Sequence, residues 1–411
     1  MKRDVVISGI GVLSPIGIGR DNYWAGLSKG KVGFGKITLF DAGPYKVHCA
    51  GEITDFDPLS ILGKKGLRDL DRSTRLICSA AKLALDDAQL KITNENAHST
   101  GVSIGSTFGS LHSIFQFDRT GLLEGPRFVN PSHFPNTVIN SPASHVSIRS
   151  KIKGFNTTIS TGFCASLDAV SYAADFIRLN RADIVLAGGV EELCEETFLG
   201  FHKLGFLSGT DSSDPICCPF DARRNGIMLS EGAAVLVLED EKHAINRGAT
   251  ILAKILGYGN AFDPSAGNHF NHAGQGLKNA IILALKDAYL NPEDVDHICA
   301  CANSTISLDR METKVIKEVF GKHAYTVPVS SIKSMVGESF SASGALSLSA
   351  GVGAIQTGLV SPTVNYKERD PECDLDYVPN EARQQCVKTV LATSTDPYGQ
   401  NTALVIGAYK G

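Results

Sequence analysis

The chain has 411 residues, of which 43% are hydrophobic and 20% are charged. This composition is typical of a protein with a large buried core, and it excludes a disordered or fibrous chain. The 39 Lys and Arg residues nearly balance the 43 Asp and Glu residues. The net charge of -4 therefore excludes the broad positive field of a general nucleic-acid-binding protein. The 10 cysteines include no Cys-x-x-Cys pair, so we expect no metal site and reduced thiols in a cytoplasmic protein.

The N-terminal apolar stretch follows two basic residues, as in a secretory signal peptide. Asp4 and Pro15 interrupt that pattern, and no small-residue cleavage site follows, so we expect no targeting segment. A buried first strand over 5–10 is the better interpretation. The Gly9 and Gly11 pair lacks the third glycine of a dinucleotide-binding loop and predicts a turn after this strand.

Strands and helices alternate along the rest of the chain. Short β-branched runs predict further strands over 101–104, 184–187, 234–238, 297–300, 387–392 and 403–406. Helical periodicity predicts helices over 79–88, 166–179, 276–289, 309–320 and 344–357. This alternation indicates an α/β fold with buried sheets. The charge-free stretch 339–366 contains too many glycines and serines for a membrane-spanning helix, so we expect no membrane partner.

Two stretches resemble each other within the chain. In 157–189, a Gly/Ser/Thr-rich approach leads into a small-residue helix, a turn and a strand, and 329–363 starts in the same way. We therefore expect two related halves, 1–250 and 251–411, that share one core.

Cys164 is a candidate nucleophile at the predicted start of a helix. Exposed N–H groups at a helix N-terminus favour the thiolate form of a cysteine. Free cysteines are also among the most buried and inert residues in proteins, so a structural thiol remains the alternative.

Four motifs identify a family resemblance that runs through nearly the whole chain. They read VISGIGVLSP at 6–15, PFDARRNG with SEG at 219–232, SIKSMVG at 331–337 and DLDYVPN at 374–380. Together they resemble the β-ketoacyl-acyl carrier protein synthase II family. The resemblance implies a dimer with the thiolase fold, in which helices and mixed sheets are layered.

The same resemblance implies a chemistry and the residues that perform it. Active members carry an acyl chain on a cysteine at a helix N-terminus, and two histidines assist decarboxylation of a malonyl group. Their substrates are held on the phosphopantetheine of an acyl carrier protein, and no other cofactor is implied.

This sequence departs from the family at each of those positions. In gap-free register, Phe163 takes the nucleophile position and Cys164 lies one residue later. One residue is about 100° of helix rotation, which turns the thiol of Cys164 away from the acyl channel unless a deletion has shifted the register. Cys301 and Glu338 take the two histidine positions, and an ionised Glu338 would repel a developing enolate.

A further departure concerns the oxyanion-binding loop. With Asn401 in register, Pro397 takes the position whose backbone N–H the family uses, and proline has no N–H. Losing one such donor typically costs about 10² to 10³ in rate. Lys333, Asp309 and Glu312 still match the family. The pattern predicts a folded scaffold without ordinary condensing activity.

Such a chain is similar to the chain length factor, or ketosynthase β subunit, of type II polyketide systems. The resemblance implies a heterodimer with an active ketosynthase, in which this subunit helps to form the polyketide tunnel and sets product length. Phe163 stands where glutamine is commonest in chain length factors, so an aromatic or a polyene pathway stays open. Two alternatives are an active synthase that uses Cys164 and a homodimeric acyl-binding protein.

The candidate tunnel follows a Gly-Ser turn. Leu111, Ile114 and Phe115 fall on one face of a predicted helix, and Phe108 precedes them. By resemblance this region lines the tunnel, and ordinary core packing is the alternative.

A basic cluster is the candidate docking surface for the carrier protein. Lys64, Lys65 and Arg68 are followed by Arg72 and Arg75. Such cations would steer an acidic carrier protein. A solvated surface partly neutralised by neighbouring aspartates is the alternative.

Overall fold

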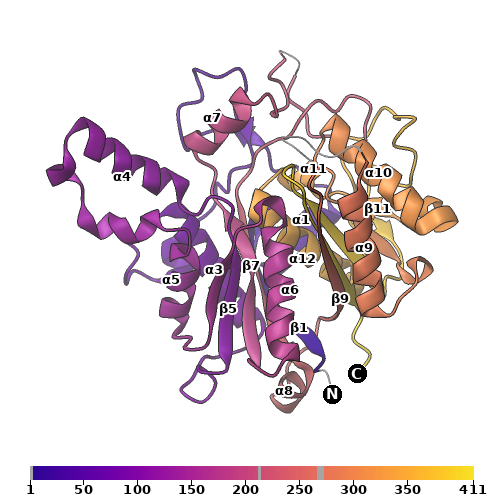
Figure 1. The fold of residues 1–411 in the computed structure, drawn as a ribbon, viewed down its shortest axis with the longest axis horizontal. Coiled ribbons are helices and arrows are strands. Elements are labelled where there is room, and N and C mark those ends of the chain that lie inside the picture. Colours follow the sequence, from indigo (N-terminus) through magenta and orange to yellow (C-terminus); the bar gives the residue numbers. More distant parts are fainter. Residues whose placement is uncertain (1–2, 212–213, 266–272) are drawn as a thin grey trace.

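The computed structural model describes residues 3–211, 214–265 and 273–411. Its core is a mixed sheet of 11 strands with helices packed against it (Figure 1). In spatial order the strands are β11 (Val329–Ser330), β10 (His297–Cys299), β14 (Thr389–Thr395), β15 (Gln400–Gly407), β9 (Ala253–Phe262), β1 (Val5–Ser14), β8 (Gly232–Asp240), β7 (Ile184–Glu191), β5 (Thr100–Gly105) and β6 (Asn156–Ile159), with β2 (Gly17–Ile18) paired to β1.

Helices form layers on either side of the strands and between them. Helix α3 packs on β1 and β8, and α9 packs on β9 and β15. The sheet has two wings, one of β1, β8, β7, β5 and β6 and the other of β9, β15, β14, β10 and β11. Between these two wings, α6 contacts β5, β7 and β15, and α12 contacts β8 and β14. The helices are α1 (Arg20–Ser28), α2 (Pro58–Leu62), α3 (Arg72–Asp87), α4 (Leu111–Leu123), α5 (Ser141–Ser150), α6 (Ala165–Arg178), α7 (Glu195–Lys203), α8 (Glu241–Asn246), α9 (Gln275–Ala288), α10 (Ile306–Phe320), α11 (Lys333–Val336) and α12 (Ser343–Thr357).

The predicted α/β architecture and all the predicted strands and helices are confirmed. The structure adds β9, whose alternating buried and half-buried residues include Gly257 and Gly259, so no continuous β-branched run marks it. In the described part of the chain, no helix is long and apolar enough to cross a membrane.

The strand pairing of one wing repeats in the other. β1 is antiparallel to β8 as β9 is to β15, and β8 is antiparallel to β7 as β15 is to β14. β7 is parallel to β5 as β14 is to β10, and β6 and β11 are the parallel edge strands. The division of the chain near residue 250 stays a prediction, because wing pairing does not locate a boundary.

The two stretches of the predicted internal echo start in the same way in the structure, and they differ after the helix. β6, α6 and β7 correspond to β11, α12 and β14 in the pairing scheme. The strand that follows α12 directly is β12 (Leu359–Val360), which pairs with β13 (Arg383–Gln384) in a separate small sheet. An insertion therefore separates α12 from its partner strand.

The predicted turn at the Gly-x-Gly pair is wrong, because Gly9 and Gly11 lie inside β1. A Cβ on Gly11 would lie 1.9 Å from the carbonyl oxygen of Ala80 on α3. On the other wing, a Cβ on Gly259 would lie 2.3 Å from the carbonyl oxygen of Ala280 on α9. The glycines therefore let each outer helix lie directly on its strand.

Two adjacent carboxylates at the end of β7 hold the segment that precedes α4. Glu191 accepts hydrogen bonds from the backbone N–H groups of Thr107 (2.9 Å) and Phe108 (3.2 Å). It also accepts a bond from the hydroxyl of Ser341 (2.6 Å). Burial raises the pKa of Glu191 to about 7, against the effect of these donors.

Glu192 connects two helix N-termini. Its carboxylate accepts bonds from the N–H of Ser73 in α3 (3.1 Å) and of His112 in α4 (3.3 Å). Burial raises the pKa of Glu192 to about 8, and repulsion from Asp71 adds to the shift. The two carboxylates thus fix the start of α4 relative to the sheet.

Gly11→Ala should destabilise the fold by about 1 to 3 kcal/mol or more, because the new methyl group would overlap the backbone of α3. Urea unfolding measures this loss. Gly35→Ala is the matched control, since a Cβ there meets no atom within 4 Å. Equal stability losses in the two variants would contradict the close-packing argument.

Glu192→Gln should flatten the pH dependence of stability. The folded protein holds the Glu192 proton up to about pH 8, above the ordinary value of 4.5, so this group's contribution is present at low pH and is lost as pH rises. For one proton, the free energy of unfolding falls by about 1.4 kcal/mol per pH unit between the ordinary pKa of 4.5 and the raised pKa of about 8. Urea unfolding between pH 5 and pH 9, with exposed Glu293→Gln as control, tests this; an unchanged slope in Glu192→Gln would refute it.

Candidate functional site

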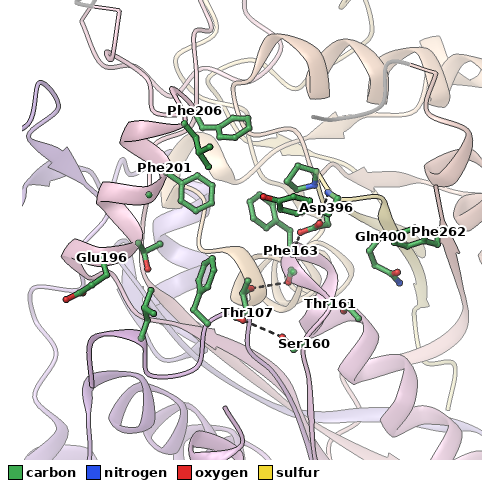
Figure 2. Close-up of a pocket in the computed structure, with 18 residues that line it drawn as sticks. Thr107, Ser160, Thr161, Phe163, Glu196, Phe201, Phe206, Phe262, Asp396 and Gln400 are labelled. Carbon is green, nitrogen blue, oxygen red and sulfur yellow. Dashed lines mark hydrogen bonds between the residues drawn. The ribbon is translucent and has the colours of Figure 1, made fainter. Parts of the chain in front are cut away.

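A cavity of about 580 Å³ opens beside the start of α6. Its walls come from the segment before α4, from α7, from the start of α6 and from the turn between β14 and β15. Figure 2 shows its lining, which is mainly apolar. The lining residues are Thr107, Phe108, Leu111, Ser160, Thr161, Gly162, Phe163, Glu196, Thr197, Gly200, Phe201, Leu204, Phe206, Phe262, Asp396, Pro397, Tyr398 and Gln400.

Phe163 forms the wall of this cavity at the position where the family resemblance places a nucleophile. It lies in the 3-10 turn η3 (Gly162–Cys164) that leads into α6, and its side chain is 4% exposed. Its ring centroid lies 5.1 Å from that of Phe340 and 6.5 Å from that of Phe201. A phenyl ring packed in this aromatic cluster offers no group that could carry an acyl chain covalently.

The thiol of Cys164 does not reach the cavity. The side chain is fully buried, and its Sγ donates to the backbone carbonyl of Gln400 at 3.4 Å. Burial raises the pKa of Cys164 well above its ordinary value, and the negative charges of Asp168 and Asp396 add to this. A protonated thiol behind the wall favours the structural interpretation of Cys164.

Cys301, Lys333 and Glu338 come together in a buried cluster that does not line the cavity. Lys333 Nζ lies 2.7 Å from Glu338 Oε2 and donates to the carbonyl oxygen of Cys301 at 2.9 Å. Burial acts to lower the pKa of Lys333, but the combined effect of the neighbouring groups, with Glu338 foremost, outweighs it and the pKa is raised. The other oxygen of Glu338 accepts from the hydroxyl of Ser343 (2.7 Å) and the N–H of Phe340 (3.1 Å).

Pro397 lines the cavity in the turn between β14 and β15, and its neighbour Asp396 supplies the polar contact of this wall. Asp396 Oδ2 accepts a bond from the backbone N–H of Phe163 at 3.0 Å, and Oδ1 accepts from the N–H of Tyr398 at 2.8 Å. Burial raises the pKa of Asp396, and the two N–H donors oppose the rise. Sequence reasoning missed Asp396, for which the Asp-Pro-x-Gly turn was the only local signal.

The four candidate tunnel residues separate into two groups. Phe108 and Leu111 line the cavity. Ile114 is half-buried and Phe115 is 44% exposed, and neither lines the cavity. Helix α4 projects from the body of the molecule (Figure 1) and has no buried residue, so core packing does not explain its apolar face.

The predicted basic cluster is smaller than the sequence indicated. Lys64, Lys65 and Arg68 are exposed between α2 and α3. Arg72 instead forms an ion pair with buried Glu231, with 2.6 Å between Nε and Oε2, and Arg75 donates to a backbone carbonyl at 3.2 Å. Lys64, Lys65 and Arg68 are therefore the most exposed cations of the predicted cluster.

These contacts define what the cavity can do. The rings that line it can bind a hydrocarbon chain, and the polar side chains at its walls include the acids Glu196 and Asp396. Among the described residues that line it, no Ser, Thr or Cys has a histidine partner that could activate it. Within the same described ranges, no group of three or more metal-ligating side chains is found.

The chain matches two adjacent family models. Residues 2–244 match the N-terminal domain of beta-ketoacyl synthases, and residues 252–367 match their C-terminal domain. A 3-oxoacyl-[acyl-carrier-protein] synthase 2 of Coxiella burnetii is 38% identical, with 98% of each chain covered. The tetracenomycin polyketide synthase ketoacyl synthase alpha subunit of Streptomyces glaucescens is 37% identical, over 100% of this chain and 98% of that protein.

Solved structures agree with these matches. The ishigamide ketosynthase/chain length factor superposes with a TM-score of 0.93 at 33% identity, covering 100% of both chains. A type II PKS ketosynthase, solved with its acyl-carrier protein and bound to the hexaketide, gives a TM-score of 0.91 at 30% identity, also over 100% of both chains. The predicted thiolase-like layering is thereby confirmed, and the chain belongs to the beta-ketoacyl synthase family.

Proposed function

We propose that this chain is a catalytically deficient ketosynthase homologue that acts as a chain length factor. It pairs with an active ketosynthase, contributes its cavity to the tunnel that receives the growing chain, and limits the length of that chain. The observation that carries the proposal is the ring of Phe163, which closes the wall where an acyl-carrying cysteine would stand.

The buried cluster supports the same conclusion. Glu338 is held by Lys333, Ser343 and Phe340, so its carboxylate has no free position from which to polarise a substrate carbonyl. Cys301 bonds to Glu312 through both its N–H (2.9 Å) and its thiol (3.2 Å). Both histidine positions are thus used to satisfy buried polar groups.

The surface for the partner is an exposed arm, residues 111–139, which comprises α4 and the segment that follows it. Large apolar side chains are exposed along this arm, with Leu122 at 85% and Leu123 at 74%. The others are Phe115, Phe128, Phe134, Val138 and Ile139. Contiguous exposed apolar side chains mark protein interaction sites. We propose that this arm binds the active ketosynthase, because the place where it begins also carries Phe108 and Leu111, which line the cavity.

The substrate is proposed to arrive as an acyl group on the phosphopantetheine of an acyl carrier protein, with no other cofactor. Lys64, Lys65 and Arg68 are the cations that would meet the acidic carrier protein.

Active condensation is the second candidate, because relatives at 38% and 36% identity are named 3-oxoacyl-[acyl-carrier-protein] synthase 2. In this chain it would require Cys164 to leave its buried contact with Gln400. A homodimeric acyl-binding protein is the third candidate, since the arm could also meet a second copy.

Intact-mass analysis after incubation with acyl-loaded carrier protein should show no acylation of the wild-type chain, because the thiol of Cys164 is protonated and enclosed. Cys164→Ala should give the same result. An active ketosynthase in a parallel reaction is the positive control. Acylation of the wild type that disappears in Cys164→Ala would establish active condensation instead.

Co-expression with candidate ketosynthases should give a stable heterodimer on size-exclusion chromatography. Leu122→Asp with Leu123→Asp should weaken it at least about 10-fold, because two charges would enter an apolar interface. Ile245→Asp is the matched control, since Ile245 is 53% exposed on α8, which lies at the bottom of Figure 1, away from α4 at the upper left. A homodimer that ignores every ketosynthase would favour the third candidate.

A further inference from the structure

The carboxylate of Asp396 makes one local and one distant contact. Oδ1 accepts from the N–H of Tyr398, two residues on, which is an ordinary turn contact. Oδ2 accepts from the N–H of Phe163, which lies 233 positions away at the start of α6. The turn alone would require only the first bond, so the second needs a separate explanation.

Gly162 makes room for this distant contact. Its φ is +61°, and a Cβ at this position would lie 1.9 Å from Asp396 Oδ2. Any other residue would therefore push the carboxylate away from the N–H of Phe163. A further bond, from the hydroxyl of Ser394 to the carbonyl oxygen of Phe163 (2.8 Å), holds the same two segments together.

If Asp396 did not accept it, the N–H of Phe163 would be a backbone donor that an acyl carbonyl or carboxylate at this part of the cavity wall could use. It lies at the start of α6, where the helix dipole favours a negative group. Asp396 lines the cavity and occupies that donor with its own charge (Figure 2). A carbonyl or carboxylate oxygen brought to this wall would find no free donor at Phe163 and would face a carboxylate.

We propose that Asp396 determines which end of an acyl chain enters the cavity. The apolar walls accept the hydrocarbon end, and Asp396 excludes the oxygen-bearing end by occupying the N–H of Phe163. This inference rests on the proposed function only in taking the ligand to be an acyl chain. In such a subunit, the chain would enter with its tail first while its thioester stays outside this cavity.

Competition between two linear ligands of equal length tests this role. Decanoate and decanol each displace a neutral fluorophore, N-phenylnaphthylamine, from the heterodimer or the isolated chain. Wild type should bind decanol more tightly than decanoate. Asp396→Ala should shift the ratio of the two affinities toward decanoate by about 10-fold or more, because the freed N–H can bind the carboxylate.

Two further variants separate the hydrogen bond from charge and from folding. Glu196→Ala removes an equal charge from the cavity lining and leaves the N–H of Phe163 occupied, so it should shift the ratio far less. Asp396→Asn keeps an acceptor for the N–H of Tyr398 and protects the turn. It should shift the ratio in the same direction as Asp396→Ala, and thermal unfolding shows that each variant is folded.

Three results would overturn the inference. They are a wild type that already prefers decanoate, an equal shift in Glu196→Ala and Asp396→Ala, and a wild type from which decanol displaces no fluorophore. None of them bears on pairing with a ketosynthase, which size-exclusion chromatography measures separately. The role of Asp396 and the proposed heterodimer can therefore fail independently.

Discussion

The first turn of α6 cannot rotate or slide, and the rest of the site depends on that constraint. Three glycines let neighbouring elements lie against it, since a Cβ on Gly105, Gly189 or Gly344 would lie within 3.0 Å of atoms of Ala165, Ser166 or Leu167. The hydroxyl of Ser166 also accepts the N–H of Ala345 from α12 at 2.9 Å. A shift by one residue would break this packing on every side. The difference between Phe163 on the cavity wall and Cys164 behind it is therefore a fixed property of the fold.

The buried charge of Lys333 imposes a second constraint on the interior near the site. Lys333 is enclosed, and removing the ion-pair partner of a buried charge typically costs about 3 to 5 kcal/mol. Glu338 supplies that partner and takes further bonds from Ser343 and Phe340. The carboxylate of Glu338 thus balances the charge of Lys333 in the interior.

The sequence predicted those features that depend on local pattern or on register. Strands and helices followed from β-branched runs and helical periodicity. The assignment of Phe163 to the nucleophile position rests on counting along a motif and stays a prediction, while the structure places Phe163 on the cavity wall. The turn expected at Gly9 and Gly11 failed because a glycine inside a strand can equally mark the close approach of a helix. The sequence placed Arg72 in the basic cluster, whereas the structure pairs it with Glu231, which lies 159 positions away and could not be identified from local pattern.

The contact between Asp396 and Phe163 shows the same limit most clearly. Its local signal predicts a turn and nothing more, and the second oxygen acquires its partner only when β14, β15 and α6 are assembled. Contacts of this kind need the folded chain, because neither segment contains a pattern that specifies the other.

One wall of the cavity and the exposed arm belong to one continuous segment. Glu191 and Glu192 hold its start through the N–H groups of Thr107, Phe108 and His112, and Phe108 and Leu111 form cavity wall there. Helix α4, which carries exposed apolar side chains, then extends away from the body of the molecule. Because the same helix begins at the cavity and ends in the exposed arm, a subunit that binds the arm would set the position of the wall. Chain length in such a pair would therefore be a property of both subunits together.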